Sequence, residues 1–116
     1  FLDGELNKAD LEEVTKLDLD GYQLTELPKN LENLTQLKVL VLSKNQLTEL
    51  PKGLEKLTQL THLNLYANQL ADVTSLEKLT KLAFLTLADN PDLTKAQIDQ
   101  LQKALPKCKI RSNPTK

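Results

Sequence analysis

Leucine residues mark out a repeating frame along the chain. When the sequence is aligned with itself at a period of 22 to 23 residues, the same apolar positions recur in phase. The frame has one leucine set at Leu17, Leu40, Leu63 and Leu85, a second at Leu19, Leu42, Leu65 and Leu87, and a preceding apolar set at Val14, Leu37, Leu60 and Leu82. A helical or strand pattern of constant period does not produce such a frame, so the chain is predicted to consist of stacked copies of one unit.

Each copy predicts a short strand followed by a return segment. In Leu40-x-Leu42 two leucines alternate with another residue, which is the period of a strand with one buried face. The return segment carries leucines every three to four residues. One such unit cannot bury its own apolar face, so neighbouring units must stack. Their strands would then pair in parallel, about 4.8 Å apart.

An asparagine follows the strand leucines in most copies. Its amide can satisfy backbone groups of its own turn and of the neighbouring turn, which would build a ladder along the stack. We expect this structural role for Asn45, Asn68, Asn90 and Asn113, whereas Tyr22 takes the position in the first copy. Asn113 belongs to a fifth, degenerate copy, which a further 23 residues place at Leu105, Cys108, Ile110 and Asn113.

The pattern Leu-x-x-Leu-x-Leu-x-x-Asn-x-Leu occurs at residues 37–47 and again at 60–70. With these motifs the chain resembles the leucine-rich-repeat family, in particular the 23-residue bacterial type, while residues 72–76 are similar to internalin repeats. The resemblance implies an α/β fold: a right-handed solenoid with a curved parallel sheet of about five strands on its concave face and a helical cap at each end. We expect one domain over residues 1–116, with repeats at about 14–36, 37–59, 60–81 and 82–104.

Both ends of the chain carry cap-like patterns. Asn7 as N-cap, with Leu6 facing Leu11, predicts a short helix at about residues 8–14 within an N-terminal cap at about 1–14. Near the other end, Thr94-x-x-Gln97 is a capping-box pattern that predicts a helix ending before Pro106. This helix belongs to a C-terminal cap at about 94–116, and the chain is expected to be a complete module.

The strand residues other than leucine are predicted to face the concave side. An apolar and aromatic group with polar neighbours lies at the centre of this face, and we expect it to contact a partner: Val39, Val41, His62, Asn64, Tyr66, Phe84 and Thr86. Charged residues lie at the two ends, where they either steer a partner or keep the ends soluble: Asp18 and Asp20 at one end, and Lys107, Lys109 and Arg111 at the other.

Binding of another protein is the function that these positions favour. Phe and Tyr are residue types that anchor interfaces. The alternative is a scaffold or spacer within a larger protein, with no dedicated ligand. An enzyme is not expected, because the single His62 and single Cys108 lie two repeats apart and Cys108 occupies a buried leucine position. Metal-ligand spacing and glycine-rich phosphate loops are absent from the sequence, so no metal or cofactor is expected.

Composition narrows the possible partners. The net charge of −1 gives no reason to expect nucleic acid, and no apolar run reaches the length of a membrane span. The chain begins at Phe1 rather than Met, which suggests that an upstream segment was removed. The internalin resemblance slightly favours a secreted or envelope protein. We expect a monomer that binds a protein partner.

Overall fold

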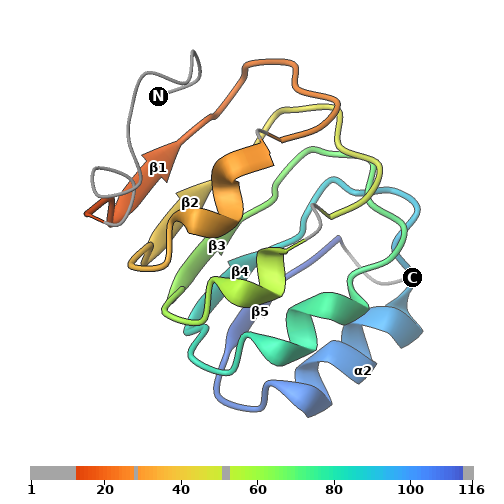
Figure 1. The fold of residues 1–116 in the computed structure, drawn as a ribbon. Coiled ribbons are helices and arrows are strands. Elements are labelled where there is room, and N and C mark those ends of the chain that lie inside the picture. The colour runs from red at the N-terminus through yellow and green to blue at the C-terminus, as the bar shows by residue number, and fades with distance from the viewer. Residues whose placement is uncertain (1–12, 28, 51–52, 114–116) are drawn as a thin grey trace.

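The computed structural model describes residues 13–27, 29–50 and 53–113. Within them lies one sheet of five parallel strands in chain order: β1 (Lys16–Asp18), β2 (Val39–Val41), β3 (His62–Asn64), β4 (Phe84–Thr86) and β5 (Lys109–Arg111). The strands lie side by side, and within the described residues β1 and β5 form the two edges of the sheet (Figure 1). The predicted N-terminal cap helix lies almost wholly outside the described residues.

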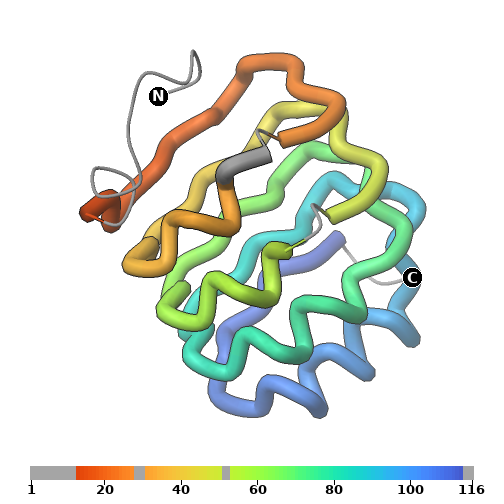
Figure 2. Tube along the Cα trace, viewed as in Figure 1, coloured from red at the N-terminus to blue at the C-terminus, as the bar shows by residue number. Residues whose placement is uncertain are grey.

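A return segment connects each strand to the next. The segments contain the 3-10 helices η1 (Lys29–Asn33), η2 (Leu54–Lys56) and η3 (Thr74–Lys78), and then the α-helix α2 (Lys95–Ala104). Each packs against its neighbour in chain order. The tube in Figure 2 shows these segments stacked on one side of the sheet, and no helix of the described residues covers its other side.

Leucines from both halves of each repeat fill the space between the sheet and the return segments. Leu40 and Leu42 from β2 and the turn after it are fully buried, as are Leu54 and Leu57 from the η2 region. The same positions are buried in the following repeats, so the core is a continuous column rather than a separate cluster in each unit.

The asparagine ladder is present in the three central turns. Asn68 accepts a hydrogen bond from the Leu47 backbone N–H (3.1 Å) and donates to the backbone oxygens of Leu42 (2.9 Å) and Leu65 (3.1 Å). Asn45 and Asn90 make the equivalent bonds one repeat earlier and one repeat later. Each asparagine therefore ties its own turn to the preceding one, as its position in the sequence predicted.

The residue before each ladder asparagine has a left-handed backbone. Lys44, Ala67 and Asp89 have φ angles of 57°, 60° and 59°. A side chain is normally disfavoured in this region, at a cost of about 1–2 kcal/mol. The turn holds these residues there because the next side chain must point back into the ladder.

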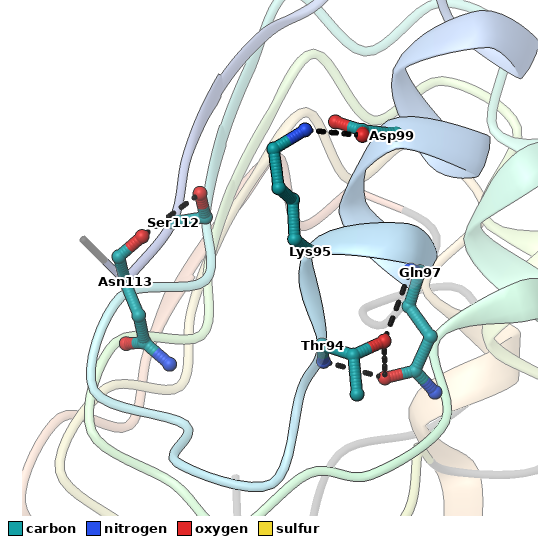
Figure 3. Close-up of polar contacts among 6 residues, drawn as sticks. All are labelled: Thr94, Lys95, Gln97, Asp99, Ser112 and Asn113. Carbon is teal, nitrogen blue, oxygen red and sulfur yellow. Dashed lines mark hydrogen bonds and ion pairs between the residues drawn. The ribbon is translucent and has the colours of Figure 1, made fainter. Parts of the chain in front are cut away.

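Helix α2 confirms the predicted C-terminal helix. The Thr94 hydroxyl accepts a hydrogen bond from the Gln97 N–H (3.2 Å), and the Gln97 side chain accepts one from the Thr94 N–H (2.8 Å), which completes the capping box (Figure 3). The helix ends at Ala104, just before Leu105 and Pro106. Leu101 on the inner side of the helix and Leu105 directly after its end are both buried in the core.

The predicted register of the last strand is wrong by two residues. In the structure Ile110, rather than Cys108, pairs with Leu85, so this repeat is longer than the 23-residue frame. The physical reason is α2. An α-helix rises about 1.5 Å per residue, against about 2.0 Å for a 3-10 helix, so it uses more residues to cover a similar distance.

Because the last strand is shifted by two residues, Asn113 is also displaced from the position predicted for it. It does not occupy the ladder position, but it still contacts the preceding turn. Its side-chain oxygen accepts a hydrogen bond from the Asp89 N–H, and its amide donates to the Asn90 backbone oxygen (2.8 Å). The Ser112 hydroxyl donates to the Asn113 carbonyl beside it (Figure 3). Asn113 therefore closes the last turn with different atoms.

Candidate concave binding face

The face of the sheet without helices is organised in rows that cross the strands. In each central strand the middle leucine is buried, and its two neighbours are half-buried or exposed, so these neighbours point to the concave face. The strand pairing aligns a first row of Lys16, Val39, His62, Phe84 and Lys109, and a second row of Asp18, Val41, Asn64, Thr86 and Arg111.

An aromatic pair forms the centre of the first row. The rings of His62 and Phe84 are stacked, with centroids 4.9 Å apart and an interplanar angle of 23°. The His62 Nδ1 lies 2.9 Å from the Thr61 hydroxyl, which fixes one side of the ring. Phe84 remains 50% exposed even though it stacks on its neighbour. The pair therefore presents a preformed apolar surface to solvent.

A shallow groove lies beside this pair. Its volume is about 250 Å³, and it extends over the three central strands. Val39 and Val41 form one side, and Phe84 and Thr86 form the other. The groove gathers six of the seven residues that the sequence predicted for the centre of the face. The seventh, Tyr66, lies in the turn after β3.

Tyr66 extends the face toward the turns. The Asn64 side chain accepts a hydrogen bond from the Tyr66 N–H (3.0 Å). A hydrogen-bonding interaction with the Asp89 carboxylate, together with its negative charge, raises the pKa of the Tyr66 phenol. The sequence frame did not single out Asp89. The available indication was its position directly before a ladder asparagine, where the turn bends back beside the preceding repeat.

The charged ends of the face differ in detail from the prediction. Asp18 and Asp20 lie at the β1 end, where the Asp20 carboxylate accepts a hydrogen bond from the Ser43 hydroxyl and the Asp18 carboxylate accepts one from the Asp20 N–H (3.0 Å). At the β5 end the corrected register places Lys109 and Arg111 in the rows. Lys107 lies before the strand and outside both rows.

His62 and Cys108, the chain's single histidine and single cysteine, lie apart in the structure. Cys108 is buried, and burial raises the pKa of its thiol, which disfavours the reactive thiolate. His62 belongs to the exposed side of β3, with β4 between it and the strand that follows Cys108. Within the described residues no three His, Cys, Asp or Glu side chains gather to hold a metal ion. Over the same residues, no helix is long and apolar enough to cross a membrane.

Comparison with known proteins agrees with this geometry. Residues 35–78 match the family Leucine Rich repeats (2 copies). A leucine-rich-repeat protein from Leptospira interrogans superimposes with a TM-score of 0.78 at 34% identity, over 90% of this chain and 27% of the other. Internalin C2 from Listeria monocytogenes superimposes with a TM-score of 0.81 at 25% identity, over 95% of this chain and 47% of the other. A search of curated proteins gave no match.

The chain is therefore a leucine-rich-repeat solenoid that resembles bacterial proteins of this kind, and it spans less than half the length of either solved structure. Domains of this fold are typically protein-binding scaffolds rather than enzymes, because stacked repeats create an extended surface for a partner.

Proposed function

We propose that this chain binds a protein partner through its concave face. The surface of contact comprises the central groove and its rim: Val39, Val41, His62, Asn64, Tyr66, Phe84 and Thr86. The single observation that carries the proposal is the half-exposed Phe84 stacked on His62 beside an apolar groove. Large aromatic side chains that are already held in place lose little conformational freedom on binding, which is why they dominate many interfaces.

The size of the face limits how a partner can bind. Five strands with about 4.8 Å between neighbours and three residues each present only about 200 Å². A standard interface buries about 800 Å² on each side. A partner must therefore also contact the turns after the strands, where Tyr66 and Asp89 lie, or else bind weakly. An envelope or secreted recognition role, suggested by the likeness to internalin C2, is compatible with either mode.

Photo-crosslinking tests the proposal directly. A benzoylphenylalanine that replaces Phe84 should crosslink to partner proteins when the chain is exposed to extracts, and mass spectrometry then identifies them. The matched control carries the same probe in place of the exposed Lys78 on η3, on the helical side of the solenoid. The proposal requires partners that are captured from position 84 and not from position 78.

A substitution series supplies the second arm of the test. Val39, Val41, Tyr66 and Phe84 are replaced together by charged residues, and circular dichroism checks that the repeat fold remains. We expect the folded quadruple variant to lose the partner identified by crosslinking. If the variant still retains that partner, the concave face is not the binding surface, and a scaffold or spacer function without a dedicated ligand becomes the better explanation.

A further inference from the structure

We propose that the concave face takes an extended segment of its partner that carries opposite charges at its two ends and apolar side chains between them. In this arrangement a basic side chain lies over Asp18, apolar side chains occupy the groove, and an acidic side chain lies over Arg111. The inference rests on the proposed function and adds the chemistry and the length of the segment that is recognised.

The second row of the face carries the inference, because it is polarised from end to end. Strand pairing aligns Asp18 with Val41, Asn64, Thr86 and finally Arg111. The three inner members are uncharged, so one anion and one cation stand at opposite ends of a neutral row. Four strand spacings of about 4.8 Å separate them by roughly 19 Å. At this distance the two charges are too far apart to neutralise each other in salt solution.

Neither terminal charge is matched by a charge within the described part of the chain. The ion pairs found there join Lys56 to Glu32 and Lys95 to Asp99, on the return segments. Among the residues that the structure describes, the Asp18 carboxylate has one hydrogen-bond donor, the Asp20 backbone N–H of its own turn. Both Asp18 and Arg111 are exposed, so each can attract an opposite charge on a partner.

The surrounding charges reinforce this polarity. Asp20 adds a second carboxylate beside Asp18, against the single cation Lys16 in the first row, so the β1 end of the face is net negative. At the β5 end Lys109 and Arg111 both face the same side, so that end is net positive. A segment with the matching order of charges is therefore favoured over one with like charges at both ends.

The length of the row determines the spacing on the partner. An extended chain advances about 3.3 Å per residue, so roughly 19 Å corresponds to six residue steps. Opposite charges at positions i and i+6 would then reach the two ends. Because alternate side chains of an extended chain point to the same side, positions i+2 and i+4 would face the groove beside Val41 and Phe84. Apolar side chains are expected at both positions.

Three blocked seven-residue peptides test the inference. Each has leucine at positions three and five with serine between, and the end residues are Lys and Glu, Lys and Lys, or Glu and Glu. Titration into the isotope-labelled protein is followed by nuclear magnetic resonance. We expect the Lys/Glu peptide to shift the amide signals of β2, β3 and β4 and to bind about two- to five-fold more tightly per matched ion pair than the like-charged peptides. High salt should remove this difference.

A charge reversal makes the test specific to the row. Arg111→Glu should weaken the Lys/Glu peptide and strengthen the Lys/Lys peptide, whereas the control Lys103→Glu on the exposed side of α2 should change neither. If all three peptides bind equally, or if none shifts the groove signals, the inference is wrong and the end charges serve only solubility. Such a result leaves the crosslinking test of the proposed function independent, because that test does not use these peptides.

Discussion

Replacement of Asn68 by alanine should destabilise the fold more than its small volume change implies. The Asn68 side chain is 3% exposed, and its oxygen is the hydrogen-bond partner of the buried Leu47 N–H. Its amide donates to the backbone oxygens of Leu42 and Leu65 and, at the longer distance of 3.5 Å, to that of Tyr66. The alanine variant removes all four bonds at once, and burial between two stacked repeats gives water no easy path to replace them.

The structure sets the size of the effect. The Leu42 and Leu65 oxygens keep a second donor, because Asn45 also donates to Leu42 and Asn90 also donates to Leu65. Only the Leu47 N–H loses its side-chain acceptor outright, at a cost of about 1–3 kcal/mol for a buried unpaired donor. Two further lost bonds add about 0.5–1 kcal/mol each. The contact to the Tyr66 oxygen, at 3.5 Å, adds little, so the variant should lose about 2–5 kcal/mol of unfolding free energy.

Urea denaturation followed by far-ultraviolet circular dichroism measures this loss. With an m-value of about 1.5 kcal/mol/M, the midpoint should fall by about 1–3 M while the slope stays the same. The matched control is Asn64→Ala, since Asn64 is half-buried and makes a single bond to the Tyr66 N–H that water can replace. The control should lose less than about 1 kcal/mol. Equal losses in the two variants would refute the ladder argument.

A second substitution separates hydrogen bonding from packing. Asn68→Asp preserves the shape and the acceptor for the Leu47 N–H, but it directs a carboxylate at the backbone oxygens that the amide normally contacts. Burial and this repulsion should raise the pKa of the new carboxyl in the folded state. Stability should therefore rise as the pH falls through that raised pKa, because the folded state then binds the proton more tightly than the unfolded state. A pH-independent loss would mean that packing, not the donor, matters.

Three further outcomes are expected. Ala67→Gly should stabilise the protein by about 0.5–1 kcal/mol, because Ala67 has a φ angle of 60° that glycine adopts without strain. The control Ala96→Gly within α2 should destabilise it, and thermal melts measure both changes. A loss of stability in both variants would contradict the strain argument. Thr94→Ala should lower the free energy of unfolding by about 1 kcal/mol, because it removes the capping box. Asp99→Ala, which removes the exposed ion pair with Lys95, should lower it by less than about 0.5 kcal/mol. Equal losses in urea denaturation would argue against the cap. Burial raises the pKa of the Cys108 thiol in the folded state. Stability should therefore decline as the pH rises above about 9, where the thiol ionises first in the unfolded chain. Cys108→Ala should remove this part of the pH dependence of the unfolding free energy.

Much of the fold could be predicted because one packing position is used repeatedly. The paired leucines, the parallel strand order and the ladder through Asn45, Asn68 and Asn90 all follow from residues that recur in phase. From β1 to β4 the rows of the concave face followed from the same frame, because strand residues alternate between the two faces. The prediction therefore succeeded wherever a residue's environment is determined by its position in the repeat.

Side-chain arrangements that do not repeat could not be predicted in the same way. The stack of His62 on Phe84 depends on the relative rotamers of two side chains in adjacent strands, and the frame contains no information about rotamers. The interaction between Asp89 and Tyr66 joins a turn to its neighbour, where spacing alone does not place the carboxylate. Both details belong to the candidate binding site, which is where repeats differ from one another.

The last strand shows how a change on the helical side of the solenoid alters the binding side. The 23-residue frame aligns Lys107 with Phe84 and Lys109 with Thr86, but α2 lengthens the return path, and the structure instead aligns Lys109 with Phe84 and Arg111 with Thr86. The cation at the end of the polarised row is thus a guanidinium, which can bind a carboxylate through two parallel hydrogen bonds, rather than an ammonium. If the same sequence followed a return path that used two fewer residues, Lys109 would lie there instead. The type of helix behind the sheet therefore determines which cationic side chain, arginine or lysine, lies at the end of the second row on the concave face.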